Sequence, residues 1–166
     1  MRARDLGIKF EGQPGALNAI TDVPGLEVGM VTLISGEGDL IPDGGPVRTG
    51  VTAILPVGKT DTQQAIPAGI YSLNGNGEMT GSHWINETGG LSGPIMITNT
   101  HAVGTVHRGV IEWVKQNFPE AAMEWLLPVV AETWDGYLND INGAHVTTEH
   151  AISAINSATE LSCTFV

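Results

Sequence analysis

The sequence predicts a layered α/β or α+β domain, and three observations support that fold class. Short, β-branched and apolar runs of strand length recur along the chain. Two longer segments instead place their apolar residues at helical spacing. The 22 glycines and 9 prolines mark many tight turns between these elements. Strands that alternate with helices along a chain are typical of domains in which helices are layered on a sheet.

Five segments have the pattern of strands, and they are interleaved with the helical segments. They are expected at residues 26–34, 50–57, 66–73, 93–98 and 126–131. The last of them contains Pro128. Because proline has no backbone N–H to donate, its presence favours an edge strand or a bulge.

Three segments have helical character. The first runs from about residue 101 to 117, with Asn99 or Thr100 available as its N-cap and Pro119 just beyond its end. A second helix is expected at 148–158, with Thr147 as its cap. A shorter helix is expected at 78–87, where two following glycines would end it.

Length and charge limit the classes of function. A chain of 166 residues suits one domain, residues 1–166, with a core of its own. Its formal net charge is −11, and its seven lysines and arginines are too few and too scattered for a phosphate-binding face. Nucleic acid is therefore an unfavoured partner. The acidity serves solubility or a preference for cationic ligands such as a free amine.

No segment of the sequence indicates a membrane protein or a secreted one. No run approaches the roughly 20 apolar residues that a membrane span needs. The basic N-terminus lacks the apolar stretch of a secretory signal. The single cysteine, Cys163, excludes an internal disulfide and fits a reducing compartment. We therefore expect a cytoplasmic protein without membrane partners.

Two polar segments are the strongest candidates for a functional site. Residues 73–81 (LNGNGEMTG) stand between an expected strand and an expected helix, where backbone N–H groups could bind an anion or an oxyanion. The same residues could simply form a turn with a helix cap. Residues 131–143 (AETWDGYLNDING) follow an apolar strand and combine carboxylates with aromatic rings. That combination suits a cationic amine, although a solvated loop with one buried aromatic would have the same composition.

Other candidates for catalytic chemistry fail on spacing. The histidines have neither the spacing nor the acidic or cysteine partners of a metal site. Ser92 lies in a Gly-Leu-Ser-Gly-Pro segment that places Pro94 where a nucleophile elbow needs glycine. The residues alone thus indicate a domain with two polar clusters and no identifiable nucleophile or metal site.

Four motifs in order give the sequence a family resemblance over nearly its whole length. They are RARDLGI at 2–8, LNGNGEMTG at 73–81, ITNTHAVG at 97–104 and ETWDGYLNDING at 132–143. Together they resemble the L-aminopeptidase D-amidase/D-esterase family (peptidase family S58, DmpA-like), which includes the β-peptidyl aminopeptidases.

The resemblance implies a fold and a mechanism. The fold is the four-layer α/β/β/α sandwich of the DmpA and ornithine acetyltransferase type, which resembles the N-terminal-nucleophile hydrolases. Family members cleave themselves into two chains that stay together, and the new N-terminal serine of the second chain attacks the substrate. Their substrates are peptides, amino-acid amides or esters, they use no cofactor, and they assemble into homo-oligomers.

The same resemblance assigns expected substrate-binding residues to this chain. Glu132 matches the acidic residue that holds the substrate's free amine, and Trp134 matches an aromatic wall of the pocket. Tyr137 and Asn142 lie where the family has polar groups near the reacting carbonyl. Asn74 and Asn76 are expected to shape the site.

The sequence departs from the family pattern at its C-terminus. After residue 158 it ends in TELSCTFV, which does not match a cleavage site. We therefore expect the nucleophilic serine and the β-chain portion to be missing, the fold to be incomplete and the chain alone to be inactive. The competing hypothesis is a non-catalytic, truncated α/β domain or a subunit that binds a partner.

Overall fold

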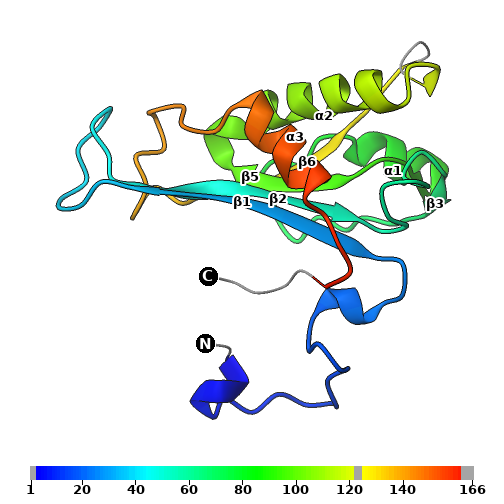
Figure 1. The fold of residues 1–166 in the computed structure, drawn as a ribbon, viewed down its shortest axis with the longest axis horizontal. Coiled ribbons are helices and arrows are strands. Elements are labelled where there is room, and N and C mark those ends of the chain that lie inside the picture. Colours follow the sequence, from blue (N-terminus) through cyan, green and yellow to red (C-terminus); the bar gives the residue numbers. More distant parts are fainter. Residues whose placement is uncertain (1–2, 122–124, 162–166) are drawn as a thin grey trace.

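A four-stranded sheet lies at the centre of the computed structural model, which describes residues 3–121 and 125–161 (Figure 1). The strands follow the order β1-β2-β5-β6 across the sheet. β1 and β2 are antiparallel, as are β2 and β5, whereas β5 and β6 are parallel. Their bounds are Glu27–Ser35 (β1), Val47–Leu55 (β2), Ile95–Asn99 (β5) and Val129–Thr133 (β6).

Two α-helices cover one face of this sheet and build the main core with it (Figure 1). They are α2, Val103–Asn117, and α3, Thr148–Asn156. The buried positions of α2 recur at the predicted helical spacing, and the inward face of the strands supplies the other half of the core. The strand residues in this core are Val51, Ala53, Leu55, Met96 and Val130. Both long predicted helices are therefore confirmed.

Of the two N-cap candidates in the sequence, Asn99 is the one that caps, and it caps the short turn that precedes α2. Asn99 Oδ1 accepts a hydrogen bond from the backbone N–H of Ala102 at 3.0 Å. A short 3-10 turn, η3 (Thr100–Ala102), then leads directly into α2. At α3, the backbone N–H of Thr147 donates to His150 Nδ1 at 3.1 Å.

Two glycines allow α3 to approach its neighbours closely. A Cβ atom at Gly29 of β1 would lie 1.9 Å from the carbonyl oxygen of Ala154 in α3. A Cβ atom at Gly109 of α2 would lie 2.7 Å from Ala151 Cβ and 2.9 Å from the Thr148 carbonyl oxygen. α3 therefore packs against both the sheet and α2 at separations that leave no room for a side chain at these positions.

The segment between β2 and β5 differs from the prediction in two ways. The expected strand at 66–73 is reduced to β3, Ile66–Pro67, which pairs with an unpredicted two-residue strand, β4, Gly90–Leu91. The expected helix at 78–87 is α1, Ser82–Thr88, which starts later. Its beginning is displaced because residues 78–80 pair with β6 instead of entering the helix. As predicted, glycine ends it, with Gly89 at a φ of 65°.

β6 begins three residues later than the sequence predicts, directly after Pro128. It is an outer strand of the described sheet, in agreement with the edge position that Pro128 favours. Proline cannot donate to the ladder, so the regular pairing with β5 starts at the next residue, where Val129 stands opposite Ile95.

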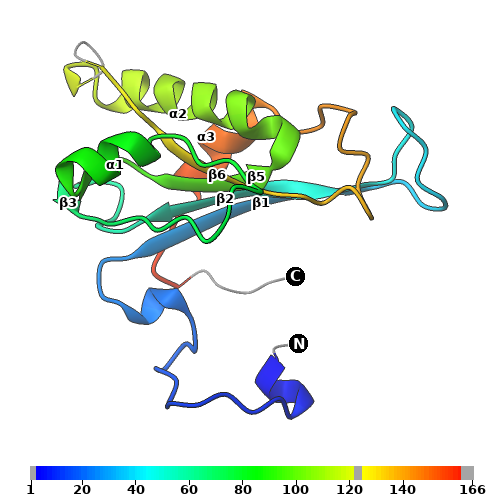
Figure 2. The ribbon, with the colours of Figure 1, turned by 180° about the vertical axis from the view of Figure 1, so that it is seen from behind.

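The face of β1 and β2 opposite α2 and α3 carries no α-helix within the described ranges (Figure 2). A shallow depression on this face is lined by residues that include Met30, Thr32, Gly50, Thr52 and Ile97. The N-terminal segment, with the 3-10 turns η1 (Ala3–Leu6) and η2 (Ile20–Asp22), extends away from the layers. The described residues thus form one sheet with α-helices layered on one face, and the second face of that sheet is open. No helix in the described ranges is both long enough and apolar enough to cross a bilayer.

Candidate active site

Glu132 is the centre of the candidate site. It is the fourth residue of β6, at the end where β5 also finishes, because the two strands are parallel. Its carboxylate accepts a hydrogen bond from the hydroxyl of Thr100, which starts the η3 turn. The N-terminal end of a helix carries a partial positive charge, so this position favours a carboxylate.

The glycine-rich segment 73–81 lies directly beside β6. Met79 and Ala131 form an antiparallel bridge, and the Glu132 N–H donates to the carbonyl oxygen of Glu78 at 3.2 Å. The Thr80 hydroxyl reinforces the contact by donating to the Pro128 carbonyl at 2.7 Å. The two polar segments that the sequence singled out, separated by about 50 residues, therefore meet at one place.

This arrangement changes the chemistry expected of residues 73–81. The sequence allowed them to present a helix N-terminus to an anion, but α1 starts only at Ser82 and the segment pairs with β6. The segment instead places its backbone beside the Glu132 carboxylate. A Cβ atom at Gly77 would lie 3.0 Å from Glu132 Oε1.

Asn74 and Asn76 form a local turn within this segment. The backbone N–H of Asn76 donates to Asn74 Oδ1 at 2.8 Å, which is an Asx-turn arrangement. Both residues are exposed. Asn74 therefore shapes the loop, while its carboxamide oxygen is already engaged within it.

Trp134 and Tyr137 form an aromatic pair on the loop that follows β6. Their ring centroids lie 5.0 Å apart at 78°, an edge-to-face contact. Trp134 is 59% exposed and Tyr137 is 85% exposed, so neither ring is buried in a core. Gly136 is required for the contact, because a Cβ atom there would come within 2.7 Å of the Trp134 ring. Asn142 is exposed further along the same loop.

The loop is anchored by two buried polar residues to which the sequence analysis gave no role. Asn139 accepts a hydrogen bond from the Arg48 N–H at 2.9 Å and donates to Asp135 Oδ1 at 3.0 Å. Asp140 accepts from the Asp43 N–H at 3.1 Å and contacts His145 Nε2 at 3.2 Å. Both belong to the motif at 132–143, but nothing in their sequence pattern distinguished a buried anchor from a solvated residue.

Hydrogen bonding keeps Asp140 charged. Burial alone would raise the pKa of this carboxyl group, but its contacts lower the pKa below the ordinary value. Those contacts are the hydrogen bonds from the Asp43 backbone and from His145, the charge of His145, and a bond from the Gly45 backbone. The charged form of Asp140 therefore belongs to the folded state that holds the loop in place.

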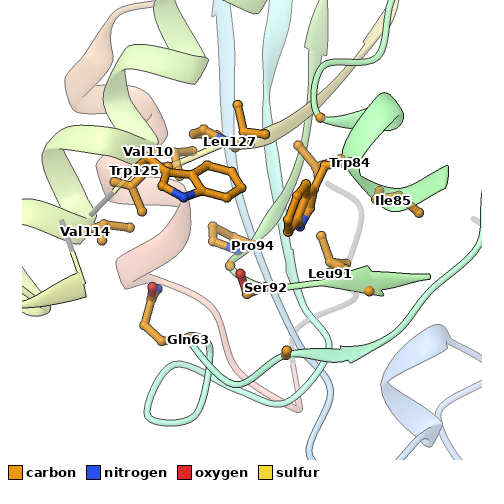
Figure 3. A pocket seen from close by; sticks show the side chains of 17 residues that line it. Gln63, Trp84, Ile85, Leu91, Ser92, Pro94, Val110, Val114, Trp125 and Leu127 are labelled. Carbon is orange, nitrogen blue, oxygen red and sulfur yellow. The ribbon is translucent and has the colours of Figure 1, made fainter. Parts of the chain in front are cut away.

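A separate pocket of about 260 Å³ opens between α1, α2 and residues 125–129 (Figure 3). Trp84 and Trp125 form part of its wall, with ring centroids 4.8 Å apart at 87°. Gln63 points into it, and its Nε2 is buried without a hydrogen-bond partner in the described residues. No local sequence pattern reveals this pocket, because its walls come from five separate segments of the chain.

The described ranges contain no cluster of metal-ligating side chains. No group of three or more His, Cys, Asp or Glu residues is placed there to hold a metal ion. Burial lowers the pKa of His107, a partly buried residue of α2. Ser92 lies on the rim of the Trp84 pocket. Cys163 lies outside the described residues.

Comparison with known proteins identifies the family. The model of peptidase family S58 matches residues 18–164. The β-peptidyl aminopeptidase BapA of Sphingosinicella microcystinivorans is 58% identical over 158 residues, which are 95% of this chain but 39% of that protein. The chain therefore spans about two fifths of the length of that curated relative.

Solved structures agree with this result and with the predicted fold class. A protein of Pyrococcus horikoshii OT3 superposes with a TM-score of 0.88 and 43% identity, covering 96% of this chain and 46% of its own. The L-aminopeptidase D-Ala-esterase/amidase of Ochrobactrum anthropi superposes with a TM-score of 0.83 and is 44% identical. The match covers 96% of this chain and 45% of that protein. The latter is described as a prototype of the serine aminopeptidases and a new variant of the Ntn hydrolase fold. The fold prediction is confirmed, and the chain belongs to peptidase family S58.

Proposed function

We propose that this chain is the substrate-recognition part of a serine aminopeptidase and that Glu132 binds the free amine of the substrate. The observation that carries the proposal is the placement of Glu132, half-buried at the end of β6 and held by Thr100. An aminopeptidase must distinguish a terminal ammonium from an uncharged internal amide. A partly desolvated carboxylate makes that distinction, because it forms an ion pair with the ammonium, whereas an uncharged amide N–H can offer it only a hydrogen bond.

The surroundings of Glu132 support this role. Hydrogen bonds to charged groups contribute about 1.5–3 kcal/mol, which corresponds to a discrimination of roughly ten- to a hundredfold. Trp134 and Tyr137 follow on the same loop with exposed rings, and aromatic faces also attract cations. We propose that this aromatic pair forms one wall for the bound substrate, that Asn142 contributes a polar group near the scissile carbonyl, and that Asn74 and Asn76 shape the opposite wall.

The attacking group is proposed to come from polypeptide other than this chain. In the described residues, none of the serine hydroxyls has a hydrogen bond to a histidine or a carboxylate. Two of them bond to backbone carbonyls instead, Ser72 to Asn74 and Ser157 to Ala154. An N-terminal serine does not need such a partner, because its own amine can take up the proton. The family relationship makes this the mechanism that we propose for the complete enzyme.

The open face of β1 and β2 gives a place for the remaining portion. It exposes Ile34, which is 65% accessible, next to the depression around Thr32 and Thr52. In a four-layer sandwich this face would be covered by the second sheet. We propose that the β-chain portion of the enzyme supplies that sheet together with the nucleophile, and that such pairs form homo-oligomers.

Activity assays test the proposal in two steps. The purified chain should not hydrolyse an aminoacyl-p-nitroanilide, whereas the chain combined with the portion that carries the nucleophile should. Turnover by the chain alone would show that it contains its own nucleophile. If the combined protein were also inactive, the alternative of a non-catalytic domain that binds a partner would be favoured.

A substitution then tests the amine role. Glu132→Gln keeps the shape of the side chain and removes its charge. The ratio of kcat/KM for a free-amine substrate to that for its des-amino analogue should fall roughly ten- to a hundredfold. An unchanged ratio would remove Glu132 from this role.

A further inference from the structure

The two oxygens of the Glu132 carboxylate have different surroundings. Oε2 accepts the hydrogen bond from Thr100, while Oε1 faces the backbone of Gly77. No hydrogen bond to Oε1 occurs among the described residues. One oxygen is thus held by the protein, and the other remains available beside a residue without a side chain.

We propose that Thr100 is a positioning residue that fixes the Glu132 carboxylate and that Gly77 is a specificity-determining position that keeps Oε1 open for a substrate ammonium. This inference rests on the proposed function of Glu132 and adds the two residues that make its carboxylate selective. In this arrangement Oε1 is the oxygen that accepts the hydrogen bond from the substrate ammonium.

Thr100 is suited to hold the carboxylate because its own backbone is fixed. It follows Asn99, whose side chain caps the η3 turn, and it begins the helical run that continues through α2. A β-branched side chain has few χ1 rotamers, so the hydroxyl has little freedom of its own. A glutamate loses up to about 1.5–2 kcal/mol of rotamer entropy when it is fixed. Because Thr100 imposes this restriction before the substrate arrives, binding does not have to supply it.

Gly77 controls access to the free oxygen. An ammonium nitrogen must come within about 2.7–2.9 Å of a carboxylate oxygen to form a charge-assisted hydrogen bond. A methyl group at position 77 would lie 3.0 Å from Oε1 and occupy part of that space. Gly77 is exposed in a loop, so an alanine there is compatible with the fold.

Gly75 provides a matched control in the same loop. It is exposed as well, and a Cβ atom there would have nothing within 4 Å. Gly75→Ala and Gly77→Ala therefore make the same chemical change two residues apart, but only the second places a methyl group against the carboxylate.

The experiment uses the complete protein, that is, this chain together with the portion that supplies the nucleophile. The readout is the kcat/KM ratio between a free-amine substrate and its des-amino analogue, with KM and kcat measured separately. Thr100→Val should lower this ratio about tenfold, mainly through KM, because it removes the donor but keeps the branched shape. Thr100→Ser should restore most of the ratio. Gly77→Ala should lower it by a similar factor, and Gly75→Ala should leave it unchanged.

The outcomes separate this inference from the proposed function. If Glu132→Gln lowers the ratio while Thr100→Val and Gly77→Ala do not, the proposed function stands and the positioning role is refuted. An effect of Thr100→Val that Thr100→Ser does not restore would also refute it, since loss of packing would then explain the change. If Glu132→Gln has no effect, the proposed function and this inference both fail.

Discussion

Gly109 tests whether α2 and α3 pack as closely as the structure shows. It lies in the middle of α2, and a Cβ atom there would be 2.7 Å from Ala151 Cβ and 2.9 Å from the Thr148 carbonyl oxygen. One neighbour is a backbone oxygen, which cannot move aside without displacing α3. We therefore expect Gly109→Ala to force the two helices apart and to weaken the contact that supports the sheet.

The expected size of the effect combines two opposing contributions. Overpacking a well-packed core costs about 1–3 kcal/mol. Replacing glycine by alanine inside a helix contributes about 1 kcal/mol in the opposite direction. The net loss for Gly109→Ala is then about 0–2 kcal/mol, which is too close to zero for the variant to be informative by itself.

Gly104 removes this ambiguity because it lies in the same helix without a steric neighbour. It is exposed, and a Cβ atom there would meet nothing within 4 Å. Gly104→Ala should therefore raise the free energy of unfolding through helix propensity alone, by up to about 1 kcal/mol. The difference between the two variants isolates the packing cost of about 1–3 kcal/mol, which is about 2–12 °C in Tm for a chain of this size.

The assay is urea unfolding of the purified protein, followed by circular dichroism, with both variants measured beside the unsubstituted protein. A midpoint for Gly109→Ala clearly below that for Gly104→Ala, with equal slopes, is the expected result. Equal midpoints would refute the reasoning, because they would mean that α2 and α3 are far enough apart to accept a methyl group.

Two further predictions concern the loop anchor and the open face. The pKa of Asp140 is lowered from its ordinary value of 3.8, so the stabilisation from its charged form is present above that pH and is lost as the pH falls through the lower folded-state value. The unfolding free energies of the unsubstituted protein and of Asp140→Asn should therefore differ at pH 7 and converge below pH 3.8; a difference that is independent of pH would contradict this account. The chain without its remaining portion should self-associate in light scattering, and Ile34→Lys on the open face should reduce that association. A monodisperse monomer of the unsubstituted chain would contradict this prediction.

The sequence could predict those parts of the fold that depend on local periodicity. The stripe of Val106, Val110 and Val114 recurs along one face of a helix, so α2 could be placed within a few residues. The β1 and β2 strands follow from β-branched runs with turn residues between them. Pro128 indicated the edge strand for a local reason as well, since a missing backbone donor does not depend on tertiary structure.

The sequence could not predict those parts of the fold in which strand pairing depends on a distant segment of the chain. Residues 70–73 are apolar and aromatic enough to indicate a strand, but they pair with no strand of the described residues and stay outside the sheet. Met79 and Thr80 were assigned to a helix, yet they pair with Ala131 and Val130 of β6. Whether a short segment becomes helix or strand there is decided by which backbone lies beside it, and that information is not local.

The candidate site was predictable in composition but not in geometry, and the topology explains why. β5, α2 and β6 follow one another along the chain, and β5 and β6 are parallel. A parallel pair brings both strand ends to the same edge of the sheet, which is also where the connecting helix begins. Thr100 after β5 and Glu132 at the end of β6 therefore meet although 32 positions separate them. The motif around Thr100 and the motif around Glu132 are thus the two halves of the proposed amine site, and the proposal predicts that a substitution in either changes recognition of a free-amine substrate.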